Sequence, residues 1–309
     1  MKKDIWLIGP GNIGLDYAKV LIAQGVDFKV IGRSPAKDWP VPVFSGGVES
    51  FVELNSANMP YGAIVAVDES QLYPVTKFLI ISGVKNILIE KPGSISKFEL
   101  HHIKQLSSAH KCNLFIAYNR RFYQSVKKCK ELISSCNEPI SVNFTFTEWS
   151  HLIDFDSYNN QELERFFLCN SSHVPDTVFY LCGSPVYLDC ITKGSLDWHP
   201  SASVFSGSGV SQKGVAITYN ANWSSAGRWG IEIDLPEHKL ILRPLEKLQI
   251  QKKGELKVEK YKLNNEYLDT DFKPGLFEEV RDFINDQKDL CSINEQIENF
   301  KWYYKIANY

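Results

Sequence analysis

The sequence has no long uninterrupted apolar run, no C-x-x-C pair and almost no net charge. Its first apolar stretch is broken by Gly9 and Pro10, too early for the core of a signal peptide, and no later run approaches membrane-spanning length. The seven cysteines are odd in number and lack metal-ligand spacing, so we expect reduced thiols and no metal site. With a net charge of −2 over 309 residues, the chain has no basic excess for nucleic acid. We expect a cytoplasmic protein without a membrane or nucleic-acid partner.

What is present is enough apolar material, 44% of residues, for two domains of ordinary size. Over the first 120 residues or so, apolar strands alternate with helical patterns, which predicts a doubly wound parallel sheet. After Phe122 a helical stretch is followed by many short strands, which favours an α+β domain with a large, mostly antiparallel open sheet. We therefore predict α/β architecture, with a dinucleotide-binding domain over 1–122 and a second domain over 123–309. The predicted strands of the first part are 5–8, 28–31, 63–67, 86–89 and 113–118, and those of the second are 140–149, 186–192, 201–206, 214–223, 229–235, 238–242, 246–251 and 256–261.

The N-terminal stretch contains a glycine-rich turn between a strand and a helix. Gly9, Gly11 and Gly14 have G-x-G-x-x-G spacing, and a helical pattern follows from Asn12 to Gln24. Such a turn lets a pyrophosphate sit against the helix N-terminus, where free N–H groups favour anionic oxygens. The motif alone is weak, but in this strand–turn–helix context it predicts a dinucleotide site.

The end of the second predicted strand bears on the type of cofactor. An acidic residue here would accept hydrogen bonds from the adenosine ribose of NAD, but the sequence is Gly32-Arg33-Ser34, with Lys37 close behind. A guanidinium suits the geometry of a 2′-phosphate, so NADP(H) is the predicted cofactor, with NAD as the alternative. The other interpretation of Arg33 is a merely solvated side chain.

Two further stretches lie at the carboxyl ends of predicted strands, where ligands bind in such sheets. These are Glu90-Lys91-Pro92 and Asn119-Arg120-Arg121-Phe122. Hydride transfer at a secondary alcohol needs a proton carrier at its oxygen, and a lysine leaving a buried strand is a candidate. A solvated lysine that ends a strand is the alternative for Lys91.

With Gly9–Gly14, Glu90-Lys91-Pro92, Asn119–Phe122 and His173-Val174-Pro175-Asp176 in order, the chain resembles the Gfo/Idh/MocA oxidoreductases nearly end to end. The resemblance implies a Rossmann domain followed by a domain whose open sheet covers the substrate and commonly forms a subunit interface. It therefore implies a homodimer or homotetramer that acts on a small sugar or nucleotide-sugar.

The resemblance also implies roles for individual residues. Lys91 faces the substrate, Pro92 shapes the turn at the nicotinamide, and His173 is the catalytic histidine, with Asp176 as an orienting group. Arg121 either reaches the substrate or holds the structure together, and the aromatic side chain of Trp149 either stacks on a sugar or packs in the core. The expected cofactor-binding residues are Gly9, Gly11, Asn12, Ile13, Gly14, Arg33, Ser34, Lys37, Asp68, Glu90, Pro92, Asn119 and Arg120, and the expected substrate-binding residues are Lys91, Arg121, Tyr123, Trp149, Asn170, His173 and Asp176.

One position departs from the family pattern. Many members carry an aspartate four residues before the histidine, where this chain has Cys169, which cannot supply the same fixed negative charge. The Asn-Ser-Ser-His form is similar to members found among bacterial surface-polysaccharide enzymes. The predicted function is an NADP(H)-dependent oxidoreductase that acts at a hydroxyl or keto carbon of a sugar or nucleotide-sugar, with Lys91 and His173 handling the proton. The alternatives are an inert dinucleotide-binding regulator of the same fold and a biliverdin-reductase-like enzyme that does not need His173.

Overall fold

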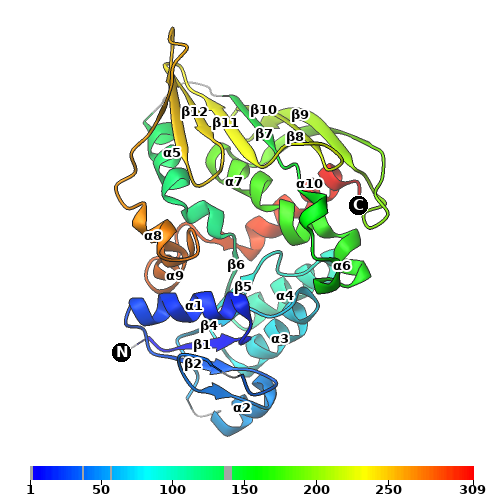
Figure 1. The fold of residues 1–309 in the computed structure, drawn as a ribbon. Helices are drawn as coiled ribbons and strands as arrows, with labels where there is room; N and C mark the ends of the chain where they lie inside the picture. Colours follow the sequence, from blue (N-terminus) through cyan, green and yellow to red (C-terminus); the bar gives the residue numbers. More distant parts are fainter. Residues whose placement is uncertain (1–2, 37, 56–57, 136–140) are drawn as a thin grey trace. The chain divides into compact units, whose positions relative to one another are not determined.

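The computed structural model describes residues 3–36, 38–55, 58–135 and 141–309 (Figure 1). The chain forms two compact units, of residues 1–119 with 270–297 and of residues 120–269 with 298–309. The domain division expected at residue 122 stays a prediction. Among the described residues, no helix combines the length and the apolar character needed to cross a bilayer.

The first unit is built on a seven-stranded sheet in the order β15-β6-β5-β4-β1-β2-β3. All neighbouring strands are parallel except β15, which runs antiparallel to β6. Strand β1 lies inside the sheet and is an apolar tetrapeptide with all four residues buried, as expected of a parallel sheet covered by helices. The strands are β1 (Ile5–Ile8), β2 (Phe28–Ile31), β3 (Val43–Phe44), β4 (Gly62–Val65), β5 (Asn86–Glu90), β6 (Asn113–Ala117) and β15 (Cys291–Ser292).

Helices cover this sheet, with α1 packed against α9, and α3 packed against α2 and α4. Two of these helix ends have residues typical of caps: Gly83 ends α3 in a left-handed conformation, and Ser96 caps α4 by accepting a hydrogen bond from the Glu99 amide. The helices are α1 (Asn12–Ala23), α2 (Gly47–Asn55), α3 (Glu69–Ser82), α4 (Lys97–Ala109) and α9 (Leu276–Ile284).

The second unit contains an eight-stranded sheet in the order β14-β13-β12-β11-β7-β10-β9-β8. It is antiparallel except for the β7–β10 pair. Its strands are β7 (Ser141–Thr145), β8 (Pro185–Lys193), β9 (Val204–Ser211), β10 (Ala216–Asn222), β11 (Gly230–Asp234), β12 (His238–Leu242), β13 (Leu248–Lys252) and β14 (Val258–Lys260). The predicted combination of a doubly wound parallel sheet and a large, mostly antiparallel sheet is therefore confirmed.

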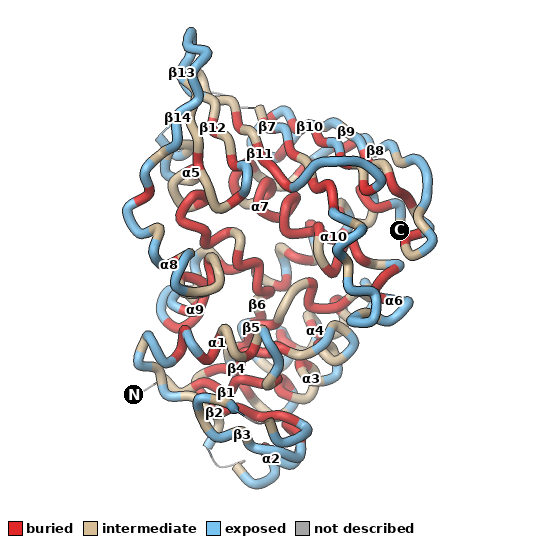
Figure 2. The backbone as a smooth tube through the Cα atoms, in the orientation of Figure 1, coloured by how far each residue is buried: buried red, intermediate tan, exposed pale blue. Residues whose placement is uncertain are grey.

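Helices α5 and α7 contact this second sheet and each other. Figure 2 shows that the residues of α7 are mostly buried, whereas many residues of the edge strand β8 and its neighbour β9 are exposed. The helical segments of this unit are α5 (Gln124–Ser134), α6 (Asn160–Glu164), a π-helix (Phe167–Ser171), α7 (His173–Cys182) and α8 (Tyr267–Thr270), with short 3-10 turns at Asn119–Phe122, Ser150–Leu152 and Phe155–Ser157. The last helix, α10 (Ile293–Ala307), contributes residues to both units.

The sequence pattern predicts one helix over 161–168, and this prediction is wrong in its detail. Asn159 and Glu162 form a capping box that begins α6 at Asn160, and α6 ends at Glu164. The chain then continues into the π-helix instead of ending, and it leads directly to His173. Helix α2 and strands β3 and β15 are additional elements that the sequence pattern did not indicate.

Candidate functional site

The turn after β1 has the backbone geometry of an anion cradle. Gly9 has φ +107°, and a Cβ there would lie 2.1 Å from the carbonyl oxygen of Ala66. A Cβ on Gly14 would lie 2.0 Å from the Gly9 carbonyl oxygen, whereas one on Gly11 would meet nothing within 4 Å. Helix α1 begins directly afterwards and has no acidic residue in its first turn, so its free N–H groups can receive an anionic group. A side chain at Gly9 or Gly14 would therefore clash with backbone atoms, whereas Gly11 borders open space.

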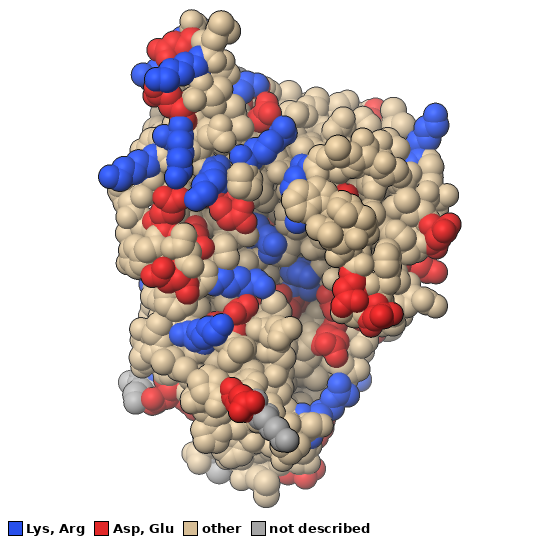
Figure 3. All heavy atoms as spheres, viewed as in Figure 1, with Lys and Arg blue, Asp and Glu red and all other residues tan. Residues whose placement is uncertain are grey.

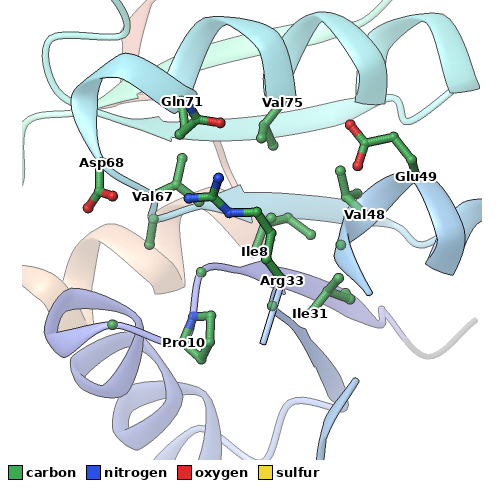
Figure 4. Close-up of a pocket in the computed structure, with 15 residues that line it drawn as sticks. Ile8, Pro10, Ile31, Arg33, Val48, Glu49, Val67, Asp68, Gln71 and Val75 are labelled. Atoms are coloured by element: carbon green, nitrogen blue, oxygen red, sulfur yellow. The ribbon is translucent and has the colours of Figure 1, made fainter. Parts of the chain in front are cut away.

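A pocket of about 310 Å³ adjoins this turn at the carboxyl ends of β1, β2 and β4 (Figure 4). Apolar walls come from Ile8, Ile31 and Val67, and Arg33 projects across the space between them. Asp68, at the start of α3, also lines the pocket and is exposed. The combination of an apolar slot, an adjacent cradle and an exposed guanidinium fits the adenosine half of a dinucleotide.

Sequence reasoning missed two polar residues of this pocket, Glu49 on α2 and Gln71 on α3. The Gly47 amide donates to the Gly32 carbonyl, which brings the start of α2 to the rim beside Arg33. The signal that could have revealed it is the Gly46-Gly47 pair, since both residues have positive φ and mark a sharp turn. A carboxylate on this wall can accept hydrogen bonds from ribose hydroxyls, and its negative charge repels a 2′-phosphate.

The other expected cofactor residues of this region lie as follows. Asn12 and Ile13 are the first residues of α1, and Ser34 is exposed beside Arg33. Lys37 lies outside the described residues.

The Glu90-Lys91-Pro92 turn directs its three residues differently. The Glu90 carboxylate accepts a hydrogen bond from the Tyr17 hydroxyl at 2.8 Å, and burial raises the pKa of Glu90. Lys91 is largely buried, with its Nζ 3.8 Å from Oε1 of Glu69. The Lys91–Pro92 peptide bond is cis, and the Pro92 carbonyl accepts from Gln296 at 2.9 Å. The turn is therefore held from both sides of Lys91.

Immediately after β6, Asn119 donates from its side-chain amide to the carbonyl of Pro274 at 2.9 Å. This bond connects the end of β6 to the loop before α9, within the first unit.

In the second unit, His173 lies at the start of α7 and is only 2% exposed. Nη1 of Arg120 lies 2.8 Å from its Nε2. Because a guanidinium can only donate, Nε2 accepts this hydrogen bond, which assigns the proton of the neutral ring to Nδ1. The guanidinium of Arg120 also lies 5.3 Å from the Trp229 ring centroid, and the His173 ring lies 6.2 Å from the same indole. Arg120, His173 and Trp229 form one cluster, which we call the histidine cluster.

Arg121 and Asp176 make a buried, two-pronged ion pair. Nε and Nη2 of the arginine donate to the two carboxylate oxygens at 2.8 and 2.6 Å, and the two side chains are 1% and 0% exposed. The Tyr303 hydroxyl adds a longer contact to Asp176 at 3.4 Å. This pairing favours a positioning role for both residues. Tyr123 is also buried, which raises its pKa to about 12.

A buried carboxylate that sequence reasoning missed lies next to the histidine cluster. Glu148 is 3% exposed and accepts hydrogen bonds from Asn170, Ser171, Trp229 and Arg228. Desolvation raises its pKa, while the hydrogen bonds from Ser171, Arg228 and Trp229 oppose the rise. The thiol of Cys169 contacts the carbonyl of Glu162 at 3.8 Å. The side-chain amide of Asn170 is directed at Glu148. Trp149, which follows Glu148 in the chain, is half-exposed.

Charged side chains elsewhere are intermixed, as the face in Figure 3 shows. Within 3–36, 38–55, 58–135 and 141–309, no group of three or more His, Cys, Asp or Glu side chains is arranged to hold a metal ion. The six cysteines in those ranges are free thiols.

No family model and no curated protein matches the chain. Solved structures match it over essentially its whole length. A dehydrogenase (MviM) from Clostridium difficile is 19% identical with a TM-score of 0.78, covering 100% of this chain and 99% of the other. An inositol dehydrogenase homolog from Azotobacter vinelandii, complexed with NADH and myo-inositol, is 13% identical with a TM-score of 0.77, covering 100% and 95%. The UDP-N-acetylglucosamine 3-dehydrogenase GnnA from Acidithiobacillus ferrooxidans is 14% identical with a TM-score of 0.70, covering 99% and 97%. The chain therefore has the two-domain fold of the Gfo/Idh/MocA-type oxidoreductases, as the resemblance implied.

Proposed function

We propose that this protein is an NADP(H)-dependent oxidoreductase that transfers a hydride between the nicotinamide and a hydroxyl or keto carbon of a sugar or nucleotide-sugar. The observation that carries the proposal is the glycine cradle with its adjoining pocket, because Gly9 and Gly14 tolerate no side chain and Gly11 faces open space. The substrate class is supported by two proteins of this fold, an inositol dehydrogenase homolog complexed with myo-inositol and a UDP-N-acetylglucosamine 3-dehydrogenase.

We further propose that Lys91 and His173 handle the proton. The bound nicotinamide would supply the hydride acceptor or donor, and the chain must then move one proton at the substrate oxygen. Lys91 can donate from an ammonium group fixed near Glu69, and His173 can accept or donate through an imidazole oriented by Arg120. Both groups are restrained, which suits proton transfer in a defined direction.

The test of this chemistry is turnover with NADPH and a panel of keto-sugars and nucleotide keto-sugars. Lys91→Ala and His173→Ala should each lower kcat at least about a hundredfold while leaving cofactor binding intact, because general acid–base catalysis contributes about that much. Saturable cofactor binding without turnover, indifferent to Lys91→Ala, would favour the regulator. An unchanged rate in His173→Ala on the true substrate would favour the biliverdin-reductase-like alternative.

The preference for NADP rests on Arg33, whose guanidinium crosses the pocket. Titration of NADPH and NADH should show tighter NADPH binding that is lost in Arg33→Ala. The matched control is Lys19→Ala, which removes an exposed cation of α1 that does not line the pocket. Equal affinities for the two cofactors would remove the argument from Arg33, and tighter binding of NADH would favour NAD and assign the dominant influence to Glu49.

Three broader features complete the proposal. A role in surface-polysaccharide sugar metabolism is supported by the Asn-Ser-Ser-His form, and a cytoplasmic location by the free thiols. A homo-oligomer is supported by the exposed apolar residues Val186, Tyr187 and Ile191 of β8. Light scattering coupled to size exclusion would show a single monomer mass if this last inference is wrong.

A further inference from the structure

One arginine near the histidine cluster is held unusually firmly for an exposed side chain. The side chain of Arg228 is 44% exposed, yet its guanidinium carbon lies 5.0 Å from the Trp149 ring centroid and 4.9 Å from that of Trp229. Its Nη1 donates to Oε2 of Glu148 at 2.9 Å. Arginine side chains on a surface normally keep much rotamer freedom, so these contacts remove mobility in advance of any ligand.

The carboxylate that holds Arg228 is itself fully engaged on its inner side. Oε1 of Glu148 accepts from Ser171 at 2.5 Å, Asn170 at 3.0 Å and Trp229 at 3.1 Å. Burying a carboxylate costs free energy of folding. Here the buried carboxylate of Glu148 lies directly beside one exposed cation, Arg228. Polar groups buried at the expense of stability are commonly found where a protein binds or reacts.

The backbone beside Arg228 is equally constrained. The Trp149 indole N–H donates to the Gly227 carbonyl at 2.7 Å, which fixes the ring against the turn that carries Arg228. Gly227 has φ +147°, and a Cβ there would lie 3.1 Å from a Thr147 side-chain atom. The loop before β11 and the end of the β7 strand region are thereby held as one rigid corner.

Trp229 connects this corner to the histidine cluster. Its indole N–H donates a hydrogen bond to Glu148. The guanidinium groups of Arg228 and Arg120 both lie over its ring, and the centroid of the His173 ring is 6.2 Å from that of the indole. Arg228 is thus a second fixed cation close to the proposed proton carrier of this unit. The half-exposed face of Trp149 beside it is a surface on which the apolar face of a sugar ring can pack.

We infer that Arg228, oriented by Glu148 and flanked by Trp149, recognises an anionic oxygen group on the substrate. This inference rests on the proposed function, because it names the class of sugar that the histidine cluster receives. A guanidinium that uses one N–H for Glu148 retains others with fork geometry, which suits a carboxylate or a phosphate. The anion is either the carboxylate of an acidic sugar or the diphosphate of a nucleotide-sugar.

The experiment compares two pairs of probes by calorimetry and tryptophan fluorescence on the full chain, with and without NADPH. D-Glucuronate is compared with D-glucose, and UDP-N-acetylglucosamine with N-acetylglucosamine. In at least one pair, the wild-type protein should bind the anionic probe at least about tenfold more tightly, because charge-assisted hydrogen bonds to a preorganised guanidinium contribute about that much. Discrimination in the first pair assigns a sugar carboxylate, and discrimination in the second pair alone assigns the phosphates.

Variants test whether Arg228 is responsible. Arg228→Gln should abolish the discrimination, and Arg228→Lys should weaken it severalfold, because an ammonium keeps the charge but loses the fork. Arg281→Gln is the matched control, since Arg281 is also an exposed arginine paired with a buried carboxylate, Glu278, but belongs to α9 of the first unit. Its binding should equal that of the wild type. The double variant Glu148→Gln/Arg228→Gln, which leaves neither charge alone, should also lose discrimination and guards against misfolding of the single variant.

The outcomes separate this inference from the proposed function. Wild-type affinity in a folded Arg228→Gln, or no discrimination in either pair by the wild type, overturns the role of Arg228. Discrimination that depends on Arg228 without any turnover supports the role and counts against the oxidoreductase activity instead.

Discussion

The buried pair of Arg121 and Asp176 should contribute strongly to stability in a way that a double substitution reveals. Arg121→Gln leaves the Asp176 carboxylate at 0% exposure without its guanidinium partner. Removing one member of a buried ion pair typically destabilises a protein by about 3–5 kcal/mol, whereas losing an exposed pair changes stability by less than about 1 kcal/mol. We therefore expect Arg121→Gln to lower the free energy of unfolding by about 3 kcal/mol or more, measured by urea titration with circular dichroism.

The matched control is the exposed pair on α5, in which Lys128 lies 2.7 Å from Glu131. Lys128→Gln should change the unfolding free energy by less than about 1 kcal/mol. Arg121→Gln combined with Asp176→Asn should recover most of the lost stability, because no buried charge is left alone. A loss below about 1 kcal/mol for Arg121→Gln would refute the reasoning.

The same variants decide between the two roles considered for Arg121. Asp176 lies one turn along α7 from His173, so the ion pair positions the helix that carries the histidine. If Arg121 acts only by positioning, the double variant should regain part of the turnover that Arg121→Gln loses. Stability restored without any activity would instead indicate that Arg121 contacts the substrate.

Three further predictions follow from geometry and titration. Gly9→Ala should weaken NADPH binding at least about tenfold, because its Cβ would lie 2.1 Å from the Ala66 carbonyl oxygen. The control Gly25→Ala should bind NADPH as the wild type does, because that Cβ meets nothing within 4 Å. Calorimetry measures both affinities. Burial lowers the pKa of His199 from 6.5 to about 4, so stability should fall as the pH falls through that interval, by about 3 kcal/mol in all; thermal melts of His199→Gln should lack this component. Burial raises the pKa of Glu90, so the folded state loses stability as the pH rises from the ordinary carboxyl range through the raised value; a Glu90→Gln pH series with the wild-type slope would contradict this.

Features that depend on local backbone geometry could be predicted from the sequence. The Gly9–Gly14 spacing encodes a turn that only glycine permits, and the alternation of strands and helices encodes the parallel sheet. The end of β5 placed Lys91 at the carboxyl edge of that sheet for the same reason. These signals are contained within short stretches of chain.

Features that depend on partners far along the chain could not be predicted from the sequence. Glu148 looks like any strand-end carboxylate, and its burial arises from partners 22 to 81 residues further along the chain. Glu49 lines the pocket beside the glycine-rich turn because a backbone hydrogen bond draws the start of α2 towards Gly32. A single sequence carries no record of which such segments meet.

The π-helix before His173 changes which earlier residue lies one helical turn away from a given position. In an α-helix, with about 3.6 residues per turn, the residue four positions earlier lies one turn away on the same side. Here the Ser172 amide donates to the Phe167 carbonyl, five residues back, at 2.8 Å, so the turn holds one residue more. Counting four positions back from His173 to Cys169 therefore does not identify the residue stacked beneath the histidine. A deletion of one residue between Phe167 and Ser171 should therefore return this turn to α-helical length, because the wider turn is what accommodates the extra residue. The same deletion within α7 has no such turn to absorb it and would rotate the residues on either side by about 100° relative to each other.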